Sequence, residues 1–176
     1  MIAGYALVDA LASERVDLFA MGNLKYWLEL NTTVLCGTDP MDRAEYAQHR
    51  QSTEQRFYEE RDGGIRDLVE WNHGRGAESV WVRAAGLYIR LLSRPQLFVE
   101  GNHRTGALAI SYVLVSENEP PFVLTQDNAA AYFDPSTVIK NTKKQGLAMR
   151  FRSPGLTKQL ASFLAERADR RYLLAR

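Results

Sequence analysis

Apolar residues recur at helical spacing along most of the chain. Residues 15–30 carry a stripe at intervals close to three and four: Val16, Phe19, Leu24, Trp27 and Leu28. Such a stripe predicts one helix with a side that faces the core. The segments 78–92 and 104–118 are apolar nearly all round. This pattern is expected for two helices at the centre of a fold.

Capping residues and prolines divide the rest of the chain into shorter helices. Asp39 before Pro40 predicts the start of a polar helix over 41–61. Further helices are expected over 65–71, over 128–133 with Asp127 as N-cap, from Asp134 onward, and over 155–174 with Pro154 at the start. Only 32–35 and 121–124 resemble short strands. The sequence therefore predicts an all-α fold of about seven or eight helices around two buried central ones.

Length and charge narrow the class of protein. A chain of 176 residues with 45% hydrophobic content is long enough for one core, so we expect a single domain over 1–176. The 22 Lys and Arg residues nearly balance 21 Asp and Glu residues, and the net charge is +1. Because no global field would attract a polyanion, we expect neither nucleic acid nor a membrane surface as a partner.

Two features of the sequence bear on the cellular compartment: the number of cysteines and the first residues of the chain. Cys36 has no partner for an internal disulfide, which fits a reducing environment and a cytoplasmic location. The first residues contain Asp9, Glu14 and Asp17 and lack a basic region followed by a long apolar run, so no signal peptide is expected. No apolar stretch reaches the roughly 18 residues that a membrane helix needs.

Candidate chemistry is concentrated in residues 96–108, QLFVEGNHRTGAL. Gly101 permits unusual backbone angles, and the loop runs into a helix whose first N–H groups would point outward at the positive end of the dipole. Arg104 could clamp phosphate oxygens, and Glu100 could supply an oxygen ligand to Mg²⁺. These are the parts of a nucleotide-phosphate site. The alternative is that Asn102 is merely an N-cap and that Glu100 and Arg104 form a surface ion pair.

This loop resembles the signature of the Fic family, His-x-Phe-x-Asp/Glu-Gly-Asn-Gly-Arg followed by two residues and a second Arg. The matching residues are Phe98, Glu100, Gly101, Asn102 and Arg104. The likeness extends over about residues 20–150 and implies the Fic helical fold. Family members transfer AMP from ATP to a hydroxyl of a target protein, and the Doc branch transfers phosphate.

The resemblance also implies ligands and partners. Phosphate binding would fall to Gly101, Asn102, His103, Arg104 and Thr105, and binding of the Mg²⁺ of MgATP to Glu100. A protein target or an antitoxin-like partner would be expected.

Three positions depart from the family pattern. Gln96 occupies the place of the general-base His, and a carboxamide cannot accept the proton. Because general-base assistance is worth about 10²- to 10⁴-fold, transfer by the usual route should be very slow or absent. The second Arg of the family is Ala107, and the Gly between Asn and Arg is His103.

The segment 31–37, NTTVLCG, resembles the inhibitory motif of Fic proteins, Ser/Thr-x-x-x-Glu-Gly/Asn. Thr32 and Gly37 fit this frame, but Cys36 stands at the position of the inhibitory Glu. The Glu and the Arg that it would pair with, at Ala107, are thus both absent, as expected if the contact is buried. The alternative is a plain helix end with Cys36 as a small buried hydrophobe.

Two hypotheses of function follow. In the first, the protein is a catalytically impaired pseudoenzyme that binds a nucleotide or phosphate. In the second, it is an active transferase that uses His103 as a non-standard base, because a helix amino terminus favours the neutral imidazole. His49 and His73 are expected at the surface, and three scattered His with one Cys show no metal-ligand spacing.

Overall fold

The computed structural model describes residues 1–60 and 63–173, and all regular secondary structure in these ranges is helical. The prediction of an all-α fold is confirmed, although the described ranges hold ten α-helices and not seven or eight. The helices are α1 (Ile2–Ser13), α2 (Lys25–Cys36), α3 (Pro40–Glu45), α4 (Ala47–Glu59), α5 (Ile65–His73), α6 (Val80–Leu92), α7 (Asn102–Ser116), α8 (Gln126–Phe133), α9 (Ser136–Lys140) and α10 (Leu147–Glu166), with 3₁₀ turns at Met21–Asn23 and Arg170–Tyr172.

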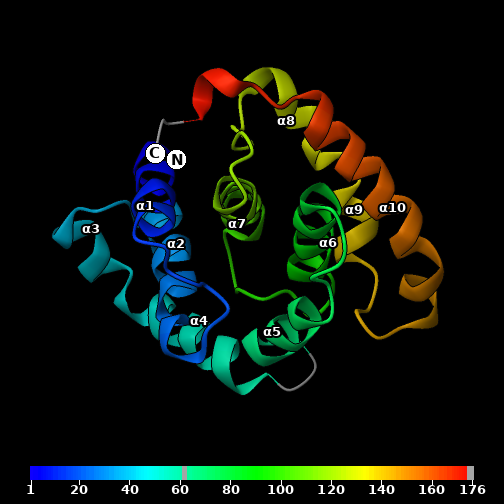
Figure 1. Ribbon diagram of the computed structural model, residues 1–176. Coiled ribbons are helices and arrows are strands. Elements are labelled where there is room, and N and C mark those ends of the chain that lie inside the picture. Colours follow the sequence, from blue (N-terminus) through cyan, green and yellow to red (C-terminus); the bar gives the residue numbers. More distant parts are fainter. Residues whose placement is uncertain (61–62, 174–176) are drawn as a thin grey trace.

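Helix α7 stands at the centre of the molecule. Helices α1 and α2 lie on one side of it and α6 on the other, with α10 outside α6 (Figure 1). Every residue of α7 except His103, Arg104 and Ser116 is buried. A helix surrounded in this way must be apolar all round, which is the pattern seen in its sequence. Helices α6 and α7 are thus the two central helices that the sequence predicts.

Helix α6 has two packed faces. A Cβ atom on Gly106 would lie 2.6 Å from the Tyr88 ring, so α7 approaches this side of α6 closely. A Cβ atom on Gly86 would lie 2.8 Å from the Trp71 ring of α5. Positions two apart on a helix point about 200° apart. Helix α6 therefore separates the α7 side of the molecule from the α5 and α10 side.

The expected helix over 15–30 is wrong at its beginning. The chain turns after α1, and α2 starts only at Lys25. Side chains bind the main chain of the turn: Asp17 Oδ1 accepts from the Phe19 N–H at 2.9 Å, and Trp27 Nε1 donates to the Leu18 carbonyl at 2.8 Å. These local bonds replace helical ones. Within the apolar stripe, Phe19, Leu24 and Trp27 are buried and Val16 and Leu28 are half-buried, and the stripe spans a turn and a helix.

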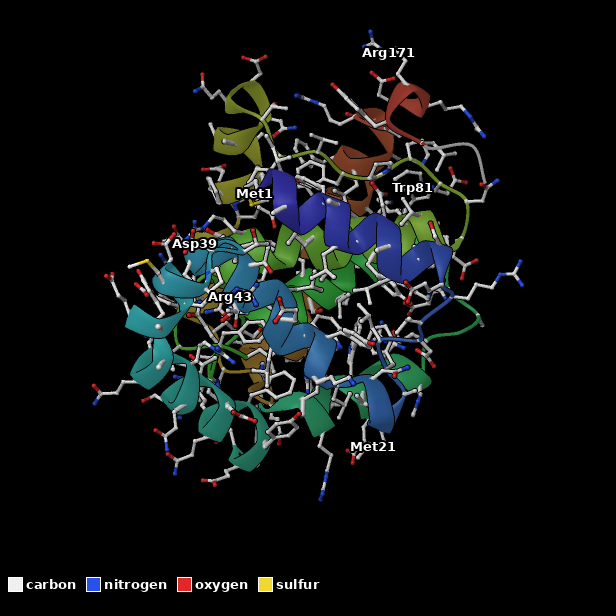
Figure 2. The ribbon with its side chains drawn as sticks, turned by 90° about the vertical axis from the view of Figure 1, so that its left-hand side faces the viewer. Met1, Met21, Asp39, Arg43, Trp81 and Arg171 are labelled. Carbon is white, nitrogen blue, oxygen red and sulfur yellow. The ribbon has the colours of Figure 1, made fainter. Side chains whose placement is uncertain are left out.

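The expected polar helix over 41–61 is two helices. Asp39 caps α3, since its side chain accepts from the Met41 N–H at 2.8 Å, as predicted. The helix then breaks at Tyr46. Arg43 (Figure 2) fixes α3 to the carboxyl end of α2 by donating to Glu29 Oε1 at 2.6 Å and to the Gly37 carbonyl at 2.9 Å. The final residue of the predicted span, 61, lies outside the described residues.

Corrections are also needed in the second half of the chain. Thr125, and not Asp127, caps α8. Helix α10 begins at Leu147, so that Pro154 lies inside it. The expected span to residue 174 ends instead at Glu166, with position 174 outside the described residues.

Neither strand candidate is a strand. Residues 32–35 are part of α2, and 121–124 belong to a connection without regular secondary structure. The Tyr5 hydroxyl donates to the Phe122 carbonyl at 3.1 Å and accepts from the Leu124 N–H at 2.8 Å. Side chains therefore supply the hydrogen bonds that a neighbouring strand would otherwise give. None of the helices described has both the length and the apolar character that crossing a membrane requires.

Candidate functional site

Aromatic packing against α4 holds the buried side of the loop between α6 and α7. Phe98 is fully buried and stacks on Phe57 of α4, with ring centroids 5.8 Å apart and planes at 11°. The Leu97 N–H donates to the Leu91 carbonyl at 3.1 Å. Val99 and Glu100, which follow, are exposed. The loop is thus anchored at its inner residues and open at its outer ones.

One amide side chain closes this loop. Asn102 Oδ1 accepts from the Phe98 N–H at 2.9 Å, and Asn102 Nδ2 donates to the Phe98 carbonyl at 2.8 Å. The side chain thereby satisfies both main-chain groups of a buried residue. Asn102 is itself buried and is the first residue of α7, so it is not the N-cap of the alternative interpretation. Its amide therefore shapes the loop.

Gly101 is the N-cap of α7 and has left-handed backbone angles, φ 74° and ψ 5°. Its carbonyl accepts from the Thr105 N–H at 2.9 Å and begins the helix. A Cβ atom here would also lie 2.9 Å from Asn31 Nδ2. Both the conformation and the close approach of α2 therefore require glycine.

The first turn of α7 has unpaired donors. In the part of the chain that the structure describes, the N–H groups of Asn102, His103 and Arg104 have no protein acceptor. Arg104 is exposed, and within the same residues it forms no ion pair, with Glu100 or with another carboxylate. Three free N–H groups at a helix amino terminus, with a guanidinium beside them, can bind an anion.

The resemblance implies that Thr105 contacts phosphate, but its side chain packs inside the protein. Its side chain is fully buried, and its hydroxyl accepts from Asn31 Nδ2 at 3.0 Å. The same Asn31 amide donates to the Glu100 carbonyl at 2.9 Å. Asn31 thus joins α2 to both sides of the Gly101 turn. Nothing in the local sequence around Asn31 indicates this role, because both of its partners lie about 70 residues away in the chain.

Gln96 stands at the upstream end of the loop, half-buried. Its side-chain Oε1 accepts from Asn102 Nδ2 at 3.3 Å, and its main-chain carbonyl accepts from Arg56 Nε at 3.0 Å. The position that the Fic signature gives to a base is thus occupied in this chain by an amide that supports the loop. This group cannot accept a proton at neutral pH.

His103 points to the other side. Its Nδ1 forms a hydrogen bond with the Tyr88 hydroxyl at 2.9 Å, and its ring lies edge-on to Phe133 with centroids 5.1 Å apart. Burial and, to a smaller extent, the charge of Lys140 lower the pKa of His103 below its usual value. The imidazole is therefore neutral at pH 7, with burial as the leading cause. The ring faces α6 and α8, whereas Gln96 faces α4 and the loop.

Glu100 is an exposed carboxylate at the tip of the loop, and 65% of its side-chain surface is accessible. His49, which the sequence predicts at the surface, is half-buried, and its Nε2 lies 3.8 Å from Oε2 of Glu100. Residues 1–60 and 63–173 contain no group of three or more His, Cys, Asp or Glu that could hold a metal ion. Glu100 could contribute one ligand to Mg²⁺, with phosphate and water supplying the others.

The residues of the suspected inhibitory frame lie at the end of α2. Thr32 and Cys36 are buried, and Cys36 Sγ donates to the Thr32 carbonyl at 3.3 Å. Gly37 ends the helix with φ 69°. Asn31 of the same helix bonds to Glu100 and Thr105 at the start of α7. The residues of this frame therefore lie close to the loop in space.

A cavity of about 220 Å³ lies between α2 and α4, beside this loop. Thr32 and Cys36 line it, together with Thr53 and His49. Among the described residues, Thr53 Oγ1 and His49 Nε2 are buried atoms without a hydrogen-bond partner. Buried polar atoms are nearly always paired, with protein, water or ligand. The cavity can therefore hold a polar group, and sequence reasoning did not find it because its walls come from two helices.

No protein-family model matches this chain, and comparisons with curated proteins and with solved structures found no significant match.

Proposed function

We propose that the protein is a Fic-like module that binds a nucleotide through its phosphates and has lost the base needed for transfer. The observation that carries the proposal is the shape of the loop 96–104. Asn102 and Gly101 fix a turn that leaves three N–H groups of α7 free beside Arg104. An anion at this point would satisfy all three donors, and the guanidinium would add charge-assisted hydrogen bonds.

The chemistry of Gln96 favours binding over transfer. In the proposed arrangement a target hydroxyl would need a proton acceptor at this position. The Gln96 carboxamide accepts a hydrogen bond from Asn102 and offers no base. Loss of general-base assistance slows transfer by about 10²- to 10⁴-fold. Glu100 would hold Mg²⁺ together with the nucleotide phosphates, and the metal would neutralise part of their charge.

The cavity between α2 and α4 supports a ligand that extends beyond the phosphates. Thr53 Oγ1 and His49 Nε2, which accept or donate no hydrogen bond among the described residues, lie on the α2 and α4 side of the loop. Cys36 replaces a larger charged residue of the resembled motif on the same side. A polar part of the bound molecule would satisfy these atoms. The protein partner of such a module would be a target or an antitoxin-like chain. A single cysteine without a disulfide partner suits a reducing compartment, and this supports the proposal of a cytoplasmic location.

A second candidate is an active transferase with His103 as base. The neutral state of the imidazole at pH 7 favours it, since a base must start unprotonated. The direction of the ring opposes it, because Tyr88 and Phe133 hold His103 on the α6 and α8 side. We therefore rank this candidate second.

Titration calorimetry with MgATP tests the proposal. We expect saturable binding by the wild type and at least about tenfold weaker binding by Arg104→Ala, since a charge-assisted contact is lost. Arg66→Ala is the matched control, because Arg66 is also an exposed arginine and belongs to α5 and not to the loop. No binding by the wild type, or equal loss in both variants, would refute the loop as the site.

Labelled ATP distinguishes the two candidates. With Mg²⁺ and the protein itself as acceptor, we expect no covalent label on the wild type. Label that appears on the wild type and disappears in His103→Gln would replace the proposal with the second candidate. Gln96→His restores the missing base at its own position and serves as the comparison for any gain of transfer.

A further inference from the structure

A second cavity lies on the opposite face of α6, between α5, α6 and α10. Its volume is about 570 Å³, and its walls come from residues 71 to 158. Val82 and Arg90 line it from α6, on the same stripe as Gly86, whereas Tyr88 of that helix faces α7. We call it the α5–α10 cavity. It is separate from the loop and from the smaller cavity beside α2.

The wall of the α5–α10 cavity is strongly basic. Five cationic side chains line it, against one carboxylate: Arg75, Arg90, Lys144, Arg150 and Lys158, with Glu78. Two of the cations are already neutralised, since Arg75 pairs with Glu78 at 2.7 Å and Arg90 pairs with Asp67. Within the described ranges, Lys144, Arg150 and Lys158 form no ion pair. The cavity wall therefore carries three cationic side chains without an ion-pair partner in the described ranges, in a chain whose net charge is only +1.

Lys144 shows that part of this charge is buried. Only 4% of the residue is exposed, and its Nζ donates to the Gly63 carbonyl at 2.8 Å. Burial lowers the pKa of Lys144 to about 8. An anion in the cavity would offset this cost, because an opposite charge nearby favours the protonated amine. Ser153 and Thr157 on α10 add hydroxyl donors to the same wall.

The rest of the wall suits a flat group that carries hydroxyls. Trp71 lines the cavity, and the Arg75 guanidinium lies 4.9 Å from its ring centroid. Val82 and Met149 add apolar surface. Glu78 Oε2 is a buried atom that lacks a donor among the described residues. A ligand hydroxyl would supply that donor, and an aromatic ring could lie against the indole.

We infer that the α5–α10 cavity binds a small phosphate ester with a hydroxyl-bearing aromatic portion, such as a nucleoside monophosphate. The phosphate lies against Lys144, Arg150 and Lys158, the hydroxyls lie toward Glu78, and the ring lies against Trp71. Charge and apolar surface together select this class over a bare anion. The inference does not depend on the function proposed for the loop.

Titration of the full chain with AMP and with inorganic phosphate tests the inference. We expect AMP to bind the wild type, and inorganic phosphate to bind at least about tenfold more weakly because it has no group for Trp71. The double variant Arg150→Gln/Lys158→Gln should weaken AMP at least about tenfold. Arg152→Gln is the matched control, since Arg152 is exposed on α10 and does not line the cavity. Arg104→Ala should leave this binding unchanged.

The indole signals of the three tryptophans give a second readout. The Nε1–H signal of Trp71, assigned with Trp71→Phe, should shift on addition of AMP, and that of buried Trp27 should not. The inference is overturned if AMP does not bind, if the double variant binds as well as Arg152→Gln, or if Arg104→Ala abolishes binding. Loss in Arg104→Ala alone would assign AMP to the loop, so failure of this inference and failure of the proposed function give different results.

Discussion

No residue of the loop 96–104 lines the α5–α10 cavity, and the two sites are built in different ways. The loop depends on neutral contacts: the stacking of Phe98 on Phe57 and the two bonds from the Asn102 amide. The cavity depends on charge, with buried Lys144 and exposed Arg150 and Lys158. A loop of the first kind keeps its shape without a ligand. In a cavity of the second kind the buried positive charge destabilises the folded protein, and a bound anion would reduce this destabilisation.

Removal of the closing amide should have the largest effect on the loop. Asn102→Ala leaves the N–H and carbonyl of buried Phe98 without partners, so we expect a loss of about 2–4 kcal/mol in the free energy of unfolding. Chemical denaturation measures this loss. Asn141→Ala is the control, because Asn141 is exposed at the end of α9. A similar small change in both variants would show that the amide does not support the loop.

The buried charge of the cavity should appear in the pH dependence of stability. The pKa of Lys144 is about 8 in the folded protein, against 10.5 as its ordinary value. Between these values the unfolded chain binds more protons, so stability should rise with pH from about 8 to about 10.5. At roughly 1.4 kcal/mol per pKa unit, the rise is at most about 3 kcal/mol.

The variant Lys144→Met isolates this effect, because other groups titrate in both proteins. Asp67 and Glu60 raise the pKa of Lys144, Arg90 and Arg56 lower it, and all four remain in the variant. We expect denaturation curves of the variant to lack the extra rise between pH 8 and 10.5. If the free energy of unfolding changed with pH in the same way in both proteins, Lys144 would not be a buried amine with a lowered pKa.

A smaller effect is expected at the turn itself. Gly101→Ala places a side chain at φ 74° and brings its Cβ to 2.9 Å from Asn31 Nδ2. The backbone conformation costs about 1–2 kcal/mol, and Asn31 must move slightly. Thermal unfolding should show this loss, with Gly155→Ala as control, because nothing lies within 4 Å of a Cβ at Gly155. Equal melting temperatures for Gly101→Ala and the wild type would contradict the need for glycine.

The sequence predicted the parts of the structure that depend on neighbouring residues. Helices α6 and α7, the Asp39 cap and the unusual backbone of Gly101 all follow from local patterns. Helix α10 did not, because a proline is read as a helix start, yet Pro154 is accommodated within a helix by losing one hydrogen bond. The turn at 14–20 was not predicted either, since local hydrogen bonds of the Asp17 and Trp27 side chains to the main chain override the helical stripe.

The same difference applies to the sites. Residues 96–104 are contiguous, so their chemistry is visible as a motif. Sequence could not show that Thr105 is buried against Asn31 or that His103 turns toward Tyr88, because both facts depend on which helix lies next to the loop. The α5–α10 cavity gathers Trp71 and Lys158 from distant segments, and only the fold brings them together.

The most direct test of the loop as an anion site is to observe its main-chain N–H groups during titration with MgATP. In an amide NMR spectrum of the full chain, we predict that the signals of Asn102, His103 and Arg104 shift most among the residues of α7 and reach saturation. Signals from these three residues that stay unchanged at saturating MgATP would contradict the account, whatever happens at Trp71.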